Sequence, residues 1–404
     1  MFRHLLKPIW KRKSRNLMLS LEILLTFVVV FAITAAAVRY YQLYHLPIGF
    51  SHESVWSVQM EQPDETGMKN DAVMYDKLKR SLQALPEVEQ VSFSAYSPYV
   101  GTTWETGFYL PESDTSVQTN IMEVSDEFFE TTDMSLLQGR WFSSVDEGAN
   151  EQPVIVNRRF AEAMFPGQDA VGKLFSHEEA GEQAGSIVRK TDKIIGVIED
   201  FRNKGEFMPP TNFALMRFSP QSSRNGVSTI LLKVKSGTPR SFEAKLSEQL
   251  KLVRNDWSYR ISPLSDLRQS MLRETVNPLI VLSVIASFLL LMVAFGLFGV
   301  LWQNTTRRIP EIGLRRAAGA TAGNIYRQII TEQLLLTSLA MVVGLFLLIQ
   351  LPITGVFGEN LSWSLFLVAA LVSITIMALV SVLCALYPAW RASRLSPTEA
   401  LHYE

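Results

Sequence analysis

One stretch of the chain carries no charged side chain over 24 residues, Leu279–Trp302. An α-helix needs about 20 mostly apolar residues to cross the hydrocarbon core of a bilayer. A helix also satisfies its own backbone hydrogen bonds, which lipid cannot do. We therefore predict a transmembrane helix here, and any water-exposed part of the chain must be attached to a membrane anchor.

Three further apolar runs have a similar length, Leu17–Val38, Leu334–Phe357 and Leu361–Pro388. The first could instead be a secretory signal peptide, because Ala35–Ala37 resembles a cleavage site. Its length and the three later runs favour an uncleaved anchor. We expect four spans, at residues 17–39, 278–302, 333–357 and 361–388.

Basic residues gather in three segments of the chain, residues 1–16, 303–332 and 389–404. Segments rich in Lys and Arg beside a span stay in the cytoplasm. The region between the first two spans, residues 40–277, instead has 24 basic and 33 acidic residues. This pattern predicts a cytoplasmic N-terminus, an exported region, a cytoplasmic segment and a cytoplasmic tail.

Strand and helix patterns alternate irregularly in residues 40–277, which predicts an α+β domain. We expect strands at Val55–Met60, Val88–Ala95, Val154–Val156, Lys193–Ile198 and Thr229–Val234, and helices at Ala72–Leu85, Arg158–Phe165 and Arg240–Arg254. A last helix, Leu264–Thr275, should continue into the next span. The predicted fold is an α-helical four-span transmembrane domain with a large α+β extracytoplasmic domain inserted between spans 1 and 2.

The segment Gly167–Leu174 matches the spacing of a nucleotide-binding P-loop, G-x-x-x-x-G-K. A P-loop also needs Ser or Thr where Leu174 stands, with a strand before it and a helix after it. We therefore expect a turn here. Neither a G-x-S-x-G elbow nor an H-E-x-x-H pattern occurs. We expect no catalytic, metal or cofactor site and no enzymatic activity.

Glu22 lies about one turn inside the first span, where a carboxylate is costly unless it is paired or reaches the headgroups. It could extend to the cytoplasmic surface or form a polar contact between spans. Small residues in the second and fourth spans allow helices to approach closely, either within the chain or across a dimer: Gly296, Gly299, Ala370, Ser373, Ser381 and Ala385.

The basic stretch Arg307–Glu332 lies between the second and third spans. Pro310 and Glu311 suit a helix start. We expect one face to carry Ile312, Leu314 and Ala317 or Ala318. The other face should carry Arg315 and Arg316. A break at Gly319 would precede a second helix that merges into the third span. The charge pattern fits either a headgroup anchor or a protein-docking helix.

Two segments resemble the FtsX-like permease domain of the MacB family of ABC transporters: PEIGLRRAAGATAGNIYRQIITEQLLL, beginning at Pro310, and YPAWRASRLSPTEAL, beginning at Tyr387. The family pattern R-x-x-E-I-G-[IL]-R-[RK]-A-x-G-A-[TS] fits residues 308–321, with Pro310 as a mild departure. Three segments of the exported region also resemble that family's periplasmic core: VSDEFFETTDMSLLQGRWFSSVDE, VIVNRRFAEAMFPGQDAVGKLF and KIIGVIEDFR.

The resemblance implies a permease subunit in the bacterial inner membrane that forms a homodimer or a heterodimer. A separate cytoplasmic ABC ATPase would bind the ATP and drive export by mechanotransmission. A periplasmic adaptor, an outer-membrane channel and membrane lipids are further partners, and nucleic acid is not. The ATPase-coupling residues would be Arg308, Glu311, Gly313, Arg315, Arg316, Gly319 and Ala320. Of these, Glu311, Arg315 and Arg316 would contact the ATPase. Three small residues, Gly313, Gly319 and Ala320, would shape the turn.

Two other functions are compatible with four spans and an exported domain. The first is an FtsX-like regulator that activates cell-wall hydrolases. The second is a membrane receptor without an ATPase, which a pull-down would distinguish.

Overall fold

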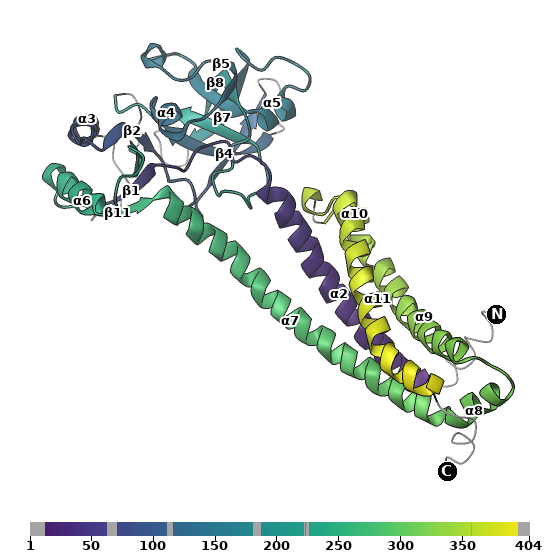
Figure 1. Cartoon of the computed structure of the whole chain (residues 1–404). Coiled ribbons are helices and arrows are strands. Elements are labelled where there is room, and N and C mark those ends of the chain that lie inside the picture. Colours follow the sequence, from purple (N-terminus) through teal and green to yellow (C-terminus); the bar gives the residue numbers. More distant parts are fainter. Residues whose placement is uncertain are drawn as a thin grey trace. The chain divides into compact units, whose positions relative to one another are not determined.

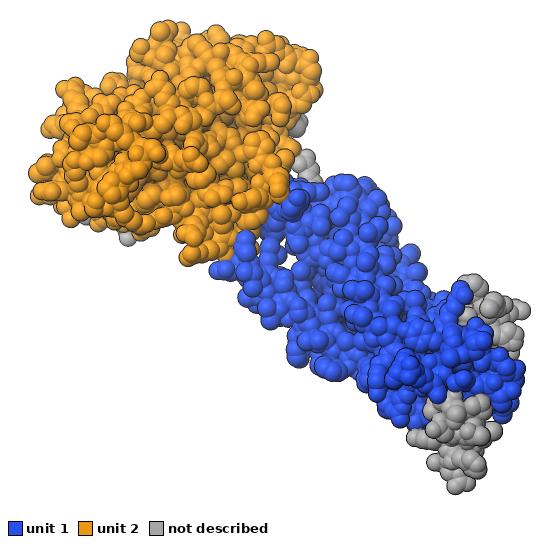
Figure 2. All heavy atoms as spheres, in the orientation of Figure 1, with its two compact units in different colours: residues 1–42, 276–404 blue, residues 43–275 orange. Residues whose placement is uncertain are grey.

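A computed structural model describes residues 13–62, 71–110, 116–180, 187–221, 223, 226–356 and 358–394. The chain divides into two compact units, shown in different colours in Figure 2. Unit 1 comprises Met1–Gln42 and Val276–Glu404, and unit 2 comprises Leu43–Thr275. The helices α2 (Lys13–Tyr44) and α7 (Leu264–Arg307) contribute residues to both units.

Unit 1 is helical. Within the described residues, four helices are long and apolar enough to cross a membrane, which confirms the predicted membrane class. They are α2, α7, α9 (Ala322–Leu348) and α11 (Trp363–Arg394), drawn in Figure 1. Three short elements complete this unit: α8 (Ile309–Ala317), α10 (Gln350–Thr354) and η2 (Gly358–Leu361).

Small and polar side chains join α9 to α11. Ser373, Ser381 and Ala385 on α11 are each fully buried, and Ala370 is nearly so. The hydroxyls of Thr337 and Ser381 lie 2.8 Å apart in a hydrogen bond. The small residues of the fourth span therefore pack within the chain, as one of the two readings predicted. Close packing of this kind lets polar groups in a membrane domain satisfy one another.

The third apolar run is interrupted near its end. Helix α9 ends at Leu348, and the short helix α10 follows after Ile349. Pro352 has no N–H with which to continue the hydrogen-bond series of α9 to Leu348. The predicted end of this span, Phe357, lies outside the described residues.

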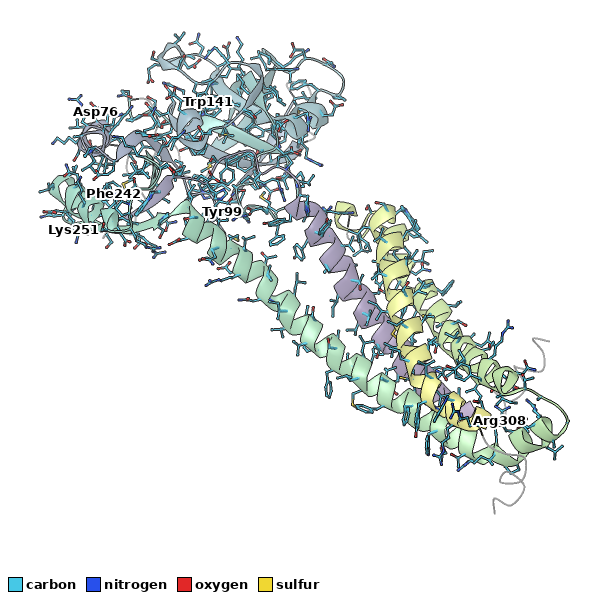
Figure 3. The ribbon with its side chains drawn as sticks, viewed as in Figure 1. Asp76, Tyr99, Trp141, Phe242, Lys251 and Arg308 are labelled. Carbon is cyan, nitrogen blue, oxygen red and sulfur yellow. The ribbon has the colours of Figure 1, made fainter. Side chains whose placement is uncertain are left out.

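One part of unit 2 is a four-stranded antiparallel sheet covered by two helices. Its elements are β1 (Val55–Glu61), α3 (Ala72–Gln83), β2 (Val88–Ser94), β10 (Thr229–Val234), α6 (Phe242–Val253) and β11 (Ser258–Pro263). The spatial order is β11-β1-β10-β2. This is a ferredoxin-like β-α-β-β-α-β arrangement. Buried leucines of both helices and the ring of Phe242, labelled in Figure 3, belong to the core that includes this sheet.

The other part of unit 2 is inserted between β2 and β10. Its strands are β3 (Trp104–Tyr109), β4 (Ser116–Val124), β5 (Leu136–Gly139), β6 (Gln152–Asn157), β7 (Leu174–Ala180), β8 (Ile187–Ile198) and β9 (Phe213–Arg217). The short helices α4 (Phe128–Thr132), η1 (Ser144–Asp146) and α5 (Arg158–Met164) connect them. Strand β9 pairs in parallel with β4, which closes the series β4-β3-β7-β8-β6-β9 into a barrel. Phenylalanines 108, 160 and 175 belong to its core.

The predicted α+β class is confirmed, and most predicted strands and helices lie within a few residues of their expected bounds. The largest difference concerns β8, which begins at Ile187 rather than Lys193. Its first half forms a hairpin with β7, and its side chains from Val188 to Thr191 are exposed. A polar hairpin gives no buried-strand pattern, so the sequence did not reveal it.

A buried arginine closes the end of α2. Arg202 is fully buried, and its guanidinium donates hydrogen bonds to the carbonyl oxygens of Leu43 at 3.0 Å, Leu46 at 2.9 Å and Met208 at 2.7 Å. The last carbonyls of a helix have no partners within the helix and carry partial negative charge. Arg202 therefore acts as a cap that fixes where the chain leaves α2.

The loop that contains Arg202 also holds the first turns of α7. Glu206 forms an ion pair with Arg268 of α7, and the Glu206 side chain is 9% exposed. The rings of Tyr44 and Phe207 lie 5.9 Å apart, centroid to centroid. Residues from the end of α2 and the start of α7 thus meet at a single loop within unit 2.

We predict that Arg202→Lys lowers the free energy of unfolding of unit 2 by about 2–4 kcal/mol, because a single ammonium leaves buried carbonyls unsatisfied. Urea unfolding of the full chain, followed by tryptophan fluorescence, measures this change. The control is Arg260→Lys. Arg260 forms an ion pair with Glu61, and the two side chains are 68% and 55% exposed. This substitution should change the free energy of unfolding by less than about 1 kcal/mol. Equal effects of the two substitutions would contradict the capping role.

Candidate functional site

Helix α8 is closed at its end by a tight turn. The N–H of Gly319 donates to the carbonyl of Arg316, and the N–H of Ala320 donates to the carbonyl of Arg315, each at 3.0 Å. This is the hydrogen-bond pattern of a Schellman motif, and Gly319 has φ +96°, which favours glycine. Gly313 is not part of this turn, because it lies buried in the middle of α8.

The two faces of α8 differ from those expected. Ile309, Ile312 and Gly313 are buried, whereas Leu314 is 65% exposed. The prediction that Leu314 shares a face with Ile312 was wrong, because residues two positions apart lie about 200° apart around a helix. The prediction for Ala317 and Ala318 was also wrong, because both are exposed. We call the exposed residues Glu311, Leu314, Arg315 and Ala318 the outward face of α8.

The buried face of α8 attaches it to three of the long helices. Ile312 belongs to a hydrophobic cluster with Leu301 of α7, Ile325 and Ile329 of α9, and Ala385, Ala389 and Ala392 of α11. Arg316 adds a polar contact, because its guanidinium donates to the carbonyl of Ser393 at 2.8 Å. A displacement of α8 must therefore move or strain the ends of these three helices.

A network of ion pairs fixes the start of α8 against α9. Arg308, labelled in Figure 3, contacts Glu311 at 3.1 Å and Glu332 of α9 at 2.6 Å. Arg315 contacts Glu311 at 2.7 Å and donates to Gln328 at 2.7 Å. Burial acts to raise the pKa of Glu311, but the bonds and charges of the two arginines outweigh it and hold that pKa below its ordinary value. Glu311 therefore stays ionised near neutral pH.

These contacts divide the predicted coupling residues into two groups. Arg308, Arg316 and Gly313 lie on the side that faces the long helices, and their contacts position α8. Glu311 and Arg315 are paired with each other and are still exposed, at 46% and 44% of their side-chain surface. The exposed side chain of Leu314 was assigned to the buried face, because a short amphipathic pattern alone does not tell which residues its neighbours cover.

Glu22 lies on α2 and is half buried. Its carboxylate lies against α7, because a Cβ added to Gly296 would be 3.1 Å from its Oε2 atom. Gly296 thus leaves room for this carboxylate between two spans. The arrangement agrees with the reading of Glu22 as a contact between spans, and its role stays a prediction.

Two known families match this chain. The family described as "MacB-like periplasmic core domain" matches residues 23–249, and the family described as "FtsX-like permease C-terminal" matches residues 283–397. The chain belongs to the MacB-like family of ABC transporter permeases. The second match includes all of α8, α9 and α11.

Individual relatives of this permease are distant. The macrolide export ATP-binding/permease protein MacB 2 of Aeromonas hydrophila is 26% identical over 332 residues, which cover 81% of this chain and 49% of the relative. The uncharacterized ABC transporter permease YknZ of Bacillus subtilis is 23% identical over 372 residues, which cover 90% of this chain and 85% of the relative. The permease spans about half the length of the MacB relatives it matches.

Solved structures also resemble parts of the permease. The periplasmic region of MacB from Actinobacillus actinomycetemcomitans gives a TM-score of 0.39 at 13% identity, and covers 57% of this chain and 97% of that one. The extracellular domain of YknZ gives a TM-score of 0.34 at 13% identity, and covers 50% and 99%.

The P-loop-like segment of the permease is a turn. Helix α5 precedes it and strand β7 follows it, which is the reverse of the order that a P-loop requires. The N–H of Gly172 donates to the carbonyl of Ile194 at 2.7 Å, and Lys173 Nζ donates to Gln168 Oε1 at 3.0 Å. These groups are occupied by the protein, as expected for a structural turn.

In the part of the chain that the structure describes, no group of three His, Cys, Asp or Glu side chains is placed to hold a metal ion. The buried pair His177 and Asp192, 2.6 Å apart, joins β7 to β8 inside the sheet. Neither observation points to chemistry at this site.

We predict that Lys173→Ala leaves the nucleotide affinity of the permease unchanged, because this lysine bonds to its own turn. Photolabelling of the purified chain with an azido-ATP probe measures this. Labelling of the wild type that disappears in Lys173→Ala would contradict the structural role of the turn.

Proposed function

We propose that this chain is the transmembrane subunit of a MacB-like transporter, and that a separate cytoplasmic ABC ATPase drives it through the outward face of α8. ATP hydrolysis on the partner would move the extracytoplasmic domain, so that a substrate is exported or extracted from the periplasm or the outer leaflet. The observation that carries this proposal is the contrast between the two faces of α8: one is packed against three helices, and the other is open.

The orientation of the chain supports a cytoplasmic α8. Residues 303–332 and 389–394 together contain seven arginines and two glutamates. Short basic segments of this kind stay on the cytoplasmic side. We therefore place both termini and α8 in the cytoplasm of a bacterial inner membrane, where ATP is available. The extreme N-terminus and residues 395–404 lie outside the described residues.

The outward face of α8 has the composition of a docking surface. Leu314 is 65% exposed and stands beside the ion pair of Glu311 and Arg315. Interfaces often bury an apolar anchor within a polar rim. Because the ion pair is already formed in the permease, a partner would not have to order these two side chains on binding.

Motion of α8 could reach unit 2 along one helix. Leu301, which packs against the buried face of α8, lies on α7, and α7 begins at Leu264. A helix transmits axial displacement well because its backbone bonds are continuous. Pro278 lies inside α7 and removes one such bond. We assign the bending of α7 during the cycle to this position.

The spans themselves offer little for a polar substrate. Among the described residues, the fully buried polar side chains of α9 and α11 include Thr337, Ser373 and Ser381. They bond to one another or to their own helix. A hydrophilic path needs polar groups that are free to replace water. This supports transmission of motion rather than passage through the spans.

A second permease copy fits the least covered span. We compare the most apolar 18-residue segment of each span by the share of it that is buried inside the structure. That share is 11% in α7, 33% in α2 and in α9, and 39% in α11. We therefore assign α7 to the dimer contact, with either an identical or a related permease. Lipid covers whatever that contact leaves open.

We predict that Leu314→Asp weakens binding of the cognate ATPase by roughly 5–30-fold, because loss of an apolar anchor costs about 1–2 kcal/mol. Co-purification from membranes and ATP turnover of the reconstituted complex measure this. Membrane insertion should be unchanged, since Leu314 is 65% exposed and lies outside the apolar cluster that joins α8 to the long helices. Arg315→Glu should act in the same direction by placing a second acid beside Glu311.

The matched control is Leu252→Asp, because Leu252 is 75% exposed on α6 of unit 2. It should leave ATPase binding unchanged. If Leu314→Asp bound the ATPase and hydrolysed ATP in the complex at wild-type levels, the docking role of α8 would be contradicted.

A further inference from the structure

Four aromatic rings from α7 and α11 form a continuous stack near the ends of these helices. The ring centroids of Trp302 and Tyr387 lie 5.9 Å apart with the planes only 5° from parallel. Phe298 stacks on Trp302 at 6.1 Å, and Trp390 stacks on Tyr387 at 6.2 Å. We call these four residues the aromatic stack.

The aromatic stack is at the surface rather than in a core. Phe298, Tyr387 and Trp390 are 37%, 51% and 46% exposed, respectively. The charge-free run of α7 ends at Trp302, and polar residues follow from Gln303. Tryptophan and tyrosine concentrate where hydrocarbon gives way to headgroups. The stack therefore lies at the membrane–water boundary, on the side that carries α8.

Two arginines lie over this stack. The guanidinium carbon of Arg391 is 4.3 Å from the ring centroid of Trp302, and that of Arg394 is 4.6 Å from the ring centroid of Trp390. Both arginines are exposed. Among the described residues, neither has a carboxylate partner, because Glu311 and Glu332 pair with other arginines. Two cations three positions apart on α11 thus lie over the rings, with no carboxylate partner in the part of the chain that the structure describes.

The geometry favours an anion that arrives from the lipid side. A guanidinium that lies over a ring face is held by the ring quadrupole, and its N–H edge stays free to donate to a phosphate. The exposed rings beside it offer apolar surface to acyl chains. Anionic headgroups near a membrane surface are attracted to arginine by about 1 kcal/mol for each charge.

We propose that the aromatic stack together with Arg391 and Arg394 binds an anionic phospholipid, with its phosphate on the two guanidinium groups and its chains along Phe298 and Tyr387. This site does not depend on ATPase docking at α8. It does share the last turn of α11 with α8, because the carbonyl of Ser393 accepts a hydrogen bond from Arg316 at 2.8 Å. A bound lipid would hold that turn in place.

The test uses the full chain in vesicles with spin-labelled phosphatidylglycerol or spin-labelled phosphatidylcholine. Electron spin resonance then gives the relative association of each lipid with the protein. The wild type should prefer phosphatidylglycerol. In the variant R391Q/R394Q that preference should fall by at least about fivefold. The variant R391K/R394K keeps both charges and should retain most of it.

The matched control is Arg327→Gln, because Arg327 is an exposed arginine of α9 on the same side and stacks on no described ring. It should change the preference by less than about twofold, since an isolated surface charge is screened. No preference in the wild type, or an equal loss in Arg327→Gln, would overturn the site.

Measurements on the wild type alone keep the proposal testable if a variant fails to fold. The preference should weaken as sodium chloride is added. Inorganic phosphate at the same ionic strength should have no greater effect, because the site needs acyl chains. Stronger displacement by phosphate would assign the arginines to a soluble anion and overturn the lipid. If R391Q/R394Q lost ATPase binding but kept its lipid preference, the two arginines would belong to a protein contact, and the lipid site would be overturned.

Discussion

The hydrogen bonds of the Arg202 guanidinium fix the end of α2 within unit 2. This guanidinium is fully buried, and it binds the carbonyls at the end of α2 together with that of Met208 in its own loop. The loop can close this tightly because Gly205 lies against the ring of Tyr99, where a Cβ would be 2.5 Å from a ring carbon. The neighbouring ion pair to Arg268 brings in α7. Within unit 2, the last residues of α2 and the first turn of α7 therefore contact the same loop.

The membrane spans could be predicted because their signal is local. Length and the absence of charge are enough, and neither depends on what packs beside the helix. The strand Thr229–Val234 was predicted with its observed bounds for a similar reason, since it contains the apolar run Ile230–Leu232 and is buried except at Lys233. The barrel was not foreseen. It closes through parallel pairing of β4 with β9, whose residues are about 90 positions apart and carry no mutual signal.

The candidate site was found from its sequence but not correctly oriented. The caps at Pro310 and Gly319 and the family pattern located α8. Which face is buried depends on Leu301, Ile325 and Ala389, which come from three other helices. With only nine residues, α8 has too few apolar positions to define a face by periodicity alone. Leu314 was therefore placed inside, and the structure turns it outward.

The exposure of Leu314 changes how α8 could act as the coupling helix we propose. If Leu314 were buried, a partner could bind α8 only through charged side chains, and exposed ion pairs contribute little binding energy in water. With Ile312 inside and Leu314 outside, α8 has apolar contacts to the long helices on one face and an exposed apolar side chain on the other. The ion pairs of Arg308 tie the start of α8 to α9. In the mechanism we propose, force from the ATPase would enter at Leu314 and leave through Ile312, while the arginines would set the angle of α8.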